Sequence, residues 1–393
     1  MRAALISIAG QPRRAGQSAP ASLAGKALAR RQLDFALAAG CERIVAVGDG
    51  GGAEAIALRH AAEAAGARFQ AIRDGHGLLG AVRATDELLV LAPGLVAEDE
   101  EVREILATGT AVLVLPAGSG VAAGFERIDL ERAWAGALVL PGALVERLAA
   151  LPPDSEPAAA LLRIALQARI PERRIAEAGL ARGSWSMVGA NDDAARRERE
   201  WLGRNMPAPA GPGLSHRLSR LALRWLGVRL LPAPRAVPTL AAGTFLLLGG
   251  GVAAAAYALP AVGLALVALG AILGDFSAGL SRLRAAPFGR LRARRSLWPV
   301  VPWLVDAALV ACAVLAIDGA WAHRLFPPLV LLGALHSIDA ARRSRASGVL
   351  GDRAILAAAF AAAAAFGLAQ PAVMLAALAV IALNAANLRA KRG

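Results

Sequence analysis

The sequence is poor in cysteine and in lysine. Cysteine occurs only at Cys41 and Cys312, which lie in different halves, so the sequence predicts neither a disulfide framework nor a cysteine metal cluster. Lysine occurs only at Lys26 and Lys391, so nearly all the positive charge is arginine. Together with the abundant alanine, this indicates the codon bias of a GC-rich genome and not a selected guanidinium surface.

Acidic residues are scarce in the second half of the chain. Residues 1–204 hold 24 basic and 25 acidic side chains, a net charge of −1, whereas residues 205–393 hold 19 basic and 5 acidic side chains, a net charge of +14. The second half is also the apolar one in a chain that is 56% hydrophobic. A nucleic-acid-binding protein would carry its basic patch on a soluble fold. The pattern therefore favours a membrane protein whose cationic loops face the cytoplasm or anionic lipid.

The first half alternates short β-rich runs with helical stretches. Such alternation predicts an α/β domain with a largely parallel sheet over residues 1–204. Gly40 and Gly66 each stand where the glycine that ends a helix is expected. The expected strands are 3–8, 43–47, 68–72, 87–91 and 111–115, and the expected helices are 27–39 and 53–65.

A proline- and glycine-rich linker over 205–213 separates the halves. The next segment, 214–235, has leucines and Trp225 at helical spacing with arginines between them, which favours an amphipathic helix at the membrane interface. A charged helix packed on the soluble domain is the alternative.

Six apolar stretches follow within the membrane domain, 236–393. Arginines cluster after the second, fourth and sixth stretches, whereas the opposite turns carry little charge beyond Arg324. The positive-inside rule then predicts a multi-pass protein of the cytoplasmic (inner) membrane with both termini in the cytoplasm. The stretches lie near 237–258, 259–274, 299–317, 325–338, 354–368 and 371–388.

A glycine- and arginine-containing loop after the first expected strand suits a nucleotide phosphate. Backbone N–H groups at Gly10 and Gly16 can approach a triphosphate, and Arg13 or Arg14 supplies a cation. With Lys26 in a Gly-Lys-Ala-Leu phrase and the segment 32–47, this stretch resembles sugar-nucleotide pyrophosphorylases and cytidylyltransferases. The resemblance implies CTP binding by Gly10, Arg13, Arg14, Gly16 and Lys26.

The metal-binding positions of that family are altered here. The strand at 88–93 ends in Gly94 where the family carries an aspartate, and Asp49 in a glycine-rich turn is a substitute or, more simply, a turn residue. Residues 183–194 resemble the family's closing element around Trp185, which leaves Asp192 and Asp193 as acids at a helix start.

The order of domains resembles the bifunctional inositol-phosphate cytidylyltransferase/di-myo-inositol-phosphate phosphate synthase group, whose membrane half is a CDP-alcohol phosphatidyltransferase. The implied fold is an α/β nucleotidyltransferase-like, Rossmann-type domain followed by an all-α six-helix transmembrane domain. The family signature falls on 274–283, where Arg282 matches in one alignment and Asp275 in an alternative alignment shifted by one residue. Its other aspartates are replaced. Asp306, inside a predicted span, is a third candidate catalytic residue, paired with an arginine of the 282–295 loop.

The resemblance implies a transferase that moves a phospho-alcohol from a CDP-activated donor to a lipid or polyol-phosphate acceptor, with Mg²⁺ or Mn²⁺ held at Asp275. The rival hypothesis is an inactive, membrane-anchored scaffold or regulator that needs no metal and binds anionic lipids. A transporter is the least favoured reading. No nucleic-acid partner is expected, and a homodimer is left open. The scattered histidines are expected to be surface or packing residues: His60, His76, His216, His323 and His336.

Overall fold

The computed structural model describes most of the chain. The chain divides into two compact units, one built on residues 1–204 and the other on residues from 205 onward. Each unit is described by itself. The described residues are 1–8, 12–13, 17–18, 22–153, 155–188, 194–206, 213–231, 233, 235–285, 300–337 and 345–389.

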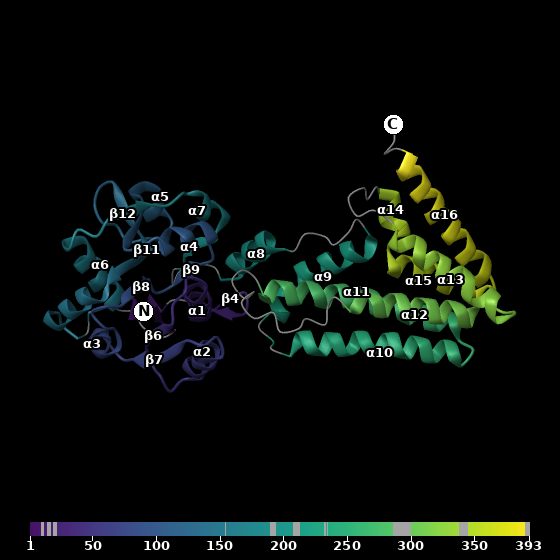
Figure 1. Cartoon of the computed structure of the whole chain (residues 1–393), viewed down its shortest axis with the longest axis horizontal. Helices are drawn as coiled ribbons and strands as arrows, with labels where there is room; N and C mark the ends of the chain where they lie inside the picture. The colour runs from purple at the N-terminus through teal and green to yellow at the C-terminus, as the bar shows by residue number, and fades with distance from the viewer. Residues whose placement is uncertain are drawn as a thin grey trace. The chain divides into compact units, whose positions relative to one another are not determined.

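The first unit is an α/β domain around a seven-stranded sheet (Figure 1). Its strand order is β12-β10-β11-β8-β1-β6-β7, and every neighbouring pair is parallel except those made by β11. The strands are β1 (Arg2–Ser7), β6 (Arg43–Val47), β7 (Arg68–Ile72), β8 (Glu87–Leu91), β10 (Ala111–Pro116), β11 (Arg132–Pro141) and β12 (Glu172–Arg174).

Three short strand pairs lie outside this sheet. The pairs are β2 (Pro12–Arg13) with β3 (Gln17–Ser18), β4 (Ser22–Leu23) with β5 (Lys26–Ala27), and β9 (Leu95–Ala97) with β13 (Trp185–Met187). The α-helices of this unit are α1 (Leu28–Ala38), α2 (Ala53–Ala64), α3 (Leu78–Ala81), α4 (Glu100–Ala107), α5 (Ala117–Ala122), α6 (Pro157–Gln167), α7 (Ala178–Arg182) and α8 (Ala194–Asn205).

The strands and helices expected in the first half are confirmed within one or two residues. Gly40 and Gly66 follow α1 and α2 with φ values of +79° and +85°, the left-handed conformation that ends a helix and that glycine adopts without strain. Strand β11 was not predicted. It is buried on both faces and so shows no alternating polar residues to reveal it.

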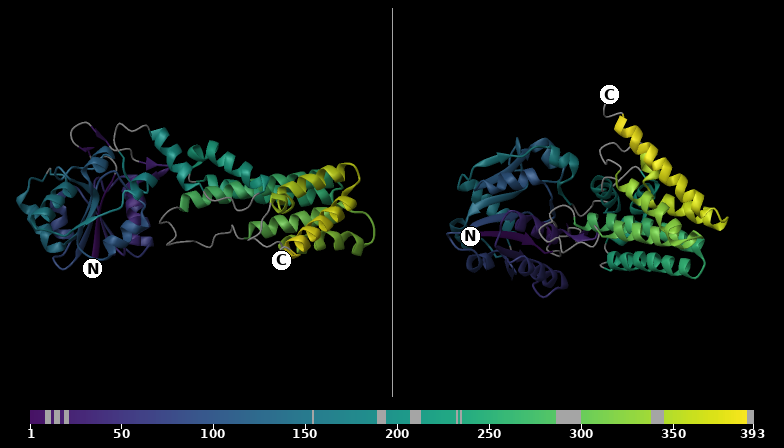
Figure 2. Two further views of the ribbon diagram at one scale, coloured as in Figure 1. Left: turned by 90° about the horizontal axis from the view of Figure 1, so that it is seen from above. Right: turned by 45° about the vertical axis from the view of Figure 1, so that its right-hand side comes forward.

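The second unit is helical (Figures 1 and 2). Each of the six expected apolar stretches contains most of one helix, and two further helices, α9 and α14, flank them. The helices are α9 (Leu214–Leu230), α10 (Ala236–Ala256), α11 (Pro260–Ala285), α12 (Val301–Ala316), α13 (Trp321–His336), α14 (Arg345–Leu350), α15 (Arg353–Ala365) and α16 (Ala369–Arg389).

Three helices of the described chain are long and apolar enough to cross a membrane: Ala236–Ala256, Pro260–Arg284 and Ala369–Ala386. Helices α12 and α15 are apolar but shorter, with 16 and 13 residues. The structure thus supports membrane-spanning helices.

Small residues allow close packing between neighbouring helices. A Cβ atom on Gly251 of α10 would lie 2.7 Å from the carbonyl oxygen of Gly263 on α11, so this crossing tolerates only glycine. One face of helix α9 packs on α11. On this face Ser219 is buried, and its Oγ donates to the Ile272 carbonyl at 3.2 Å. The opposite side of α9 exposes Leu218, Leu221 and Trp225.

Candidate functional site

The carboxyl edge of the sheet in the first unit has the geometry of a ligand site. Strand β1 lies between β6 and β8, and both run parallel to it. The chain passes from β1 to β6 and β7 on one side, and then crosses back to β8 on the other side of β1. Ligands of open α/β sheets bind outside the carboxyl ends of the strands at such a switch point. The loop after β1, which carries the predicted phosphate-binding residues, starts at this edge.

The predicted nucleotide-binding residues are described only in part. Gly10, Arg14 and Gly16 lie outside the described residues. The backbone of Arg13 belongs to β2 and pairs with Gln17. Lys26 lies on β5, and its ammonium group forms an ion pair with Asp34 of α1. Burial lowers the pKa of Lys26, and the charge of Asp34 and its hydrogen bond to the lysine oppose that shift.

A buried ion pair stands beside these residues and was missed by the sequence analysis. Arg31 of α1 pairs with Glu98, which directly follows β9, and both side chains are almost fully buried. Trp201 of α8 donates its indole N–H to Glu98 Oε2 at 3.1 Å, and the Arg31 guanidinium carbon lies 4.8 Å from the centre of the Trp201 rings. Burial lowers the pKa of Arg31 to about 10, so it remains charged at neutral pH. The pair therefore fixes α8 on this edge of the domain.

The two metal positions considered in the first half do not form a metal site. Strand β8 is followed by Ala92, Pro93 and Gly94, none of which offers a carboxylate. Asp49 Oδ1 accepts a hydrogen bond from the Gly51 N–H at 2.9 Å, so this aspartate stabilises a turn. Asp192 and Asp193 lie outside the described residues.

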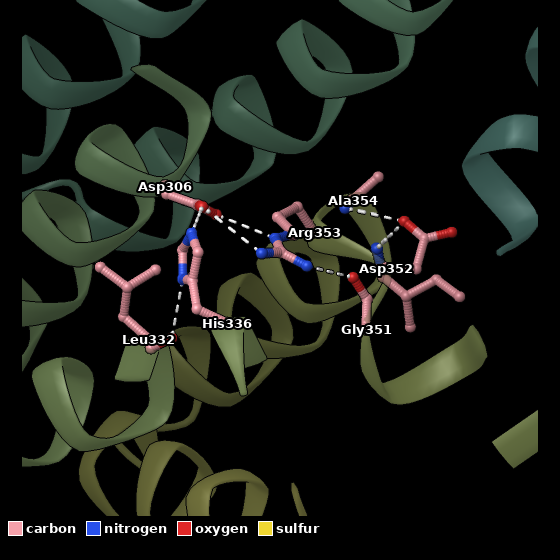
Figure 3. A network of polar contacts seen from close by, with 8 residues as sticks. Asp306, Leu332, His336, Gly351, Asp352, Arg353 and Ala354 are labelled. Carbon is pink, nitrogen blue, oxygen red and sulfur yellow. Dashed lines mark hydrogen bonds and ion pairs between the residues drawn. The ribbon is translucent and has the colours of Figure 1, made fainter. Parts of the chain in front are cut away.

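A polar cluster in the second unit forms around Asp306, whose side chain is 4% exposed (Figure 3). Arg353, the first residue of α15, donates from Nε to Asp306 Oδ1 at 2.9 Å and from Nη2 to Oδ2 at 3.4 Å. His336, the last residue of α13, places Nε2 3.4 Å from Asp306 Oδ2. Residues from the ends of two helices, α13 and α15, thus contact one buried carboxylate of α12.

The partner expected for Asp306 was an arginine of the 282–295 loop, of which residues 286–295 lie outside the described part. The observed partner is Arg353, 47 residues further along the chain. Asp352 positions that arginine because its side chain caps α15, accepting from the Ala354 N–H at 3.0 Å and the Ile355 N–H at 3.4 Å.

Both ring nitrogens of His336 face oxygen acceptors. Nδ1 lies 2.9 Å from the Leu332 carbonyl, and Nε2 faces the Asp306 carboxylate. The Trp303 ring stacks on this imidazole with centroids 4.9 Å apart and an interplanar angle of 22°.

Asp275 lies in a second polar group, in the second half of α11. Its Oδ2 is 2.9 Å from His216 Nδ1 and accepts from Ser215 Oγ at 3.2 Å. The Ser215 backbone N–H donates to Asp352 Oδ2 at 2.7 Å, so Ser215 bridges two carboxylates from different helices. His216 and His336 therefore both contact carboxylates, an arrangement that their scattered positions in the sequence did not indicate.

The three predicted catalytic residues are not brought together. Arg282 is exposed on α11, two turns beyond Asp275, and Asp306 lies on α12. No hydrogen bond or ion pair joins any two of the three in the part of the chain that the structure describes. The neighbouring Arg284 donates to the carbonyls of Leu230, Leu231 and Ala233 and so closes the end of α9.

The donors of this unit that the structure describes do not fit Mg²⁺ or Mn²⁺. Within the described ranges, no group of three or more His, Cys, Asp or Glu residues is placed to hold a metal ion. Asp275 offers one carboxylate next to an imidazole, and Asp352 and Asp306 already accept from backbone N–H groups, arginine and histidine. Mg²⁺ requires several oxygen ligands in near-octahedral geometry, which these residues do not supply.

Comparison of the chain with models of protein families and with curated proteins finds no match. The family resemblance of its motifs therefore enters only the proposal below.

Proposed function

We propose that this chain is a multi-pass protein of the inner membrane that has the architecture of a cytidylyltransferase-like domain joined to a CDP-alcohol phosphatidyltransferase-like domain, and that it acts as a membrane-anchored binding or regulatory protein. In this proposal the α/β domain binds the phosphates of a nucleotide such as CTP. The helical domain serves as the anchor and not as a metal-dependent transferase.

The observation that carries the proposal is the pairing of the aspartates at the helix ends. Asp275, Asp306 and Asp352 each accept hydrogen bonds from protein donors. Transfer of a phosphate group by paired divalent ions needs carboxylates free to coordinate those ions. For Asp306 and Asp352, removing the present partners would leave a buried charge uncompensated, which is costly.

Several features support the anchoring part of the proposal. Three helices meet the length of a membrane span, and exposed aromatic residues stand at helix ends, as in the belts at membrane interfaces: Tyr257, Trp303, Trp321 and Phe366. Six spans would include α12, α13 and α15, whose flanking residues must extend their length. The arginine-rich segments then face the cytoplasm.

The nucleotide part of the proposal rests on the position of the loop after β1 at the switch point of the sheet. Calorimetry of the full-length protein in detergent with CTP tests it, and we expect saturable binding. Arg13→Ala should weaken this binding, whereas Lys26→Gln should leave it in place because Lys26 is already paired with Asp34. The absence of any heat of binding refutes the nucleotide site.

A transferase is the second candidate, favoured by one observation: the carboxylates of Asp275 and Asp352, from different parts of the chain, lie close enough together for Ser215 to contact both. Assays with Mg²⁺ or Mn²⁺ distinguish the two functions. Release of pyrophosphate from CTP and an inositol phosphate, or turnover of a CDP-alcohol that Asp275→Asn abolishes, would establish the transferase and overturn the binding protein. The orientation is tested separately by thiol labelling at Arg343→Cys, where labelling from outside the cell refutes it.

A further inference from the structure

Helix α9 has one packed side and two exposed rows of side chains. The packed side, which lies against α11, buries Ser215, Ser219 and Leu223. The members of each exposed row are three or four residues apart, so each row follows one side of the helix. The apolar row is Leu218, Leu221 and Trp225. The arginine row, each member one residue earlier, is Arg217, Arg220 and Arg224.

The arginine row has no acidic partner. Helix α9 contains neither aspartate nor glutamate. The carboxylates of Asp275 and Asp352 approach it at its first turn, where they contact Ser215 and His216. In the part of the chain that the structure describes, no arginine of this row forms a hydrogen bond or an ion pair, and Arg220 Nε is shielded from solvent without a partner. Three positive charges beside an apolar row are therefore available to an external anion.

The position of α9 along α11 matches the boundary of a bilayer. A hydrocarbon core of about 30 Å takes about 20 residues of helix, which from Pro260 reaches about as far as Gly279. Helix α9 contacts α11 at Ile272, at Gly279 and at Arg284, on both sides of this point. Amphipathic helices at such a boundary bury their apolar side about 5–10 Å deep and keep arginines on the polar side.

The charges of the chain favour lipid over protein as the occupant of these rows. Residues 1–204 have a net charge of −1, so the first unit has almost no acidic excess to pair with the arginine row. A second copy of residues 205–393 would bring a net charge of +14 and would repel it. Acidic phospholipids supply both a negative surface and hydrocarbon beneath it.

We propose that α9 docks on a surface of acidic phospholipid, with the apolar row at the boundary between head groups and acyl chains and with the arginine row on the lipid phosphates. The docking rests on the membrane insertion in the proposed function but not on nucleotide binding. It enriches acidic lipid around the end of α11.

Fluorescence quenching tests the docking in nanodiscs made of equal amounts of phosphatidylcholine and phosphatidylglycerol. A bimane label is attached to Leu221→Cys in the full-length protein, whose own Cys41 and Cys312 are buried. One lipid at a time carries a nitroxide on its acyl chain close to the head group. We expect labelled phosphatidylglycerol to quench about fivefold more effectively than labelled phosphatidylcholine, because one arginine near a bilayer surface favours an acidic lipid by about that factor.

A charge variant and two controls separate the two rows. Replacing all three arginines of the arginine row by glutamine should make the two lipids quench equally, whereas quenching itself should persist because the apolar row is unchanged. The matched control replaces Arg169, Arg173 and Arg174, three exposed arginines of the first unit, by glutamine and should keep the preference. A label on Ile56→Cys of α2, where Ile56 is 43% exposed against 51% for Leu221, should be quenched by neither lipid.

Four results would overturn the docking. Equal quenching by the two lipids with the arginine row intact would refute the head-group contact, and no quenching by either lipid would show that protein covers the apolar row. Loss of the preference in the matched control would assign it to overall charge, and equal quenching at Ile56→Cys would assign it to the label. The comparison of the two lipids does not depend on the glutamine variant. Extraction of the chain from membranes by alkali would refute insertion itself, which an unquenched label in an alkali-resistant protein would not.

Discussion

Arg353 is the residue whose removal should destabilise the helical unit most clearly. Its side chain supplies two of the three close donors to Asp306, at 2.9 and 3.4 Å, and His336 supplies the third at 3.4 Å. Arg353→Leu leaves a carboxylate that is 4% exposed with one long contact. Breaking a buried ion pair on one side costs about 3–5 kcal/mol because the remaining charge stays buried without compensation.

The double variant Asp306→Leu/Arg353→Leu separates the net contribution of the ion pair to stability from the cost of a buried carboxylate without a partner. With both charges gone, the unfolding free energy should return to within about 2 kcal/mol of the unaltered protein, because replacing a buried pair by apolar residues is often nearly neutral. The double variant should therefore be more stable than Arg353→Leu alone.

The measurement is unfolding of the full-length protein in mixed micelles of dodecyl maltoside and SDS, followed by the helical circular-dichroism signal. Arg324→Leu is the control, since Arg324 makes a single exposed contact with a carbonyl and should cost about 1 kcal/mol or less. If Arg353→Leu is no less stable than this control, Asp306 does not depend on Arg353 and the reasoning is refuted.

Three further predictions concern the α/β domain. Trp201→Phe removes the indole donor to Glu98, so hydrogen–deuterium exchange of the α8 amides should quicken about tenfold; an unchanged rate would show that this contact does not hold α8. Burial raises the pKa of the Cys41 thiol from 9.0 to about 12. As the pH rises, the thiol therefore ionises in the unfolded chain first, so its contribution to stability, complete below pH 9, falls as the pH rises toward 12. Above pH 9 the unfolding free energy of Cys41→Ala, measured by denaturant titration, should therefore fall less steeply with pH than that of the unaltered protein. An identical pH slope for the two proteins contradicts the shift. Gly40→Ala, at φ +79° and with no atom near the new Cβ, should cost about 1–2 kcal/mol in the same titrations, whereas Gly80→Ala, in α3 with equal space, should cost nothing; equal effects would refute the conformational argument.

The candidate sites could be predicted only in part. Asp275 and Arg282 were chosen from the resemblance to a family signature, and Asp306 because an ionisable residue inside a predicted span is rare and costly. That argument finds single residues but not their partners. Arg353 lies 47 residues from Asp306, and His216 lies 59 residues from Asp275, with no spacing pattern linking either pair. The Arg31–Glu98–Trp201 contact was missed for the same reason, since its members come from α1, from the residue after β9 and from α8.

Hydrophobic pattern and backbone preference, which act over a few residues, determined the secondary-structure elements of this protein. They account for the strand–helix alternation of the first half, the glycines that end α1 and α2, and the helices of the second half. The tertiary structure alone decided that β11 enters the sheet antiparallel and that aspartates distant in sequence meet arginine, histidine and serine at the ends of helices. These outcomes depend on contacts between segments far apart in the chain. A buried carboxylate must find a donor, but only the packing of the helices determines which one it finds.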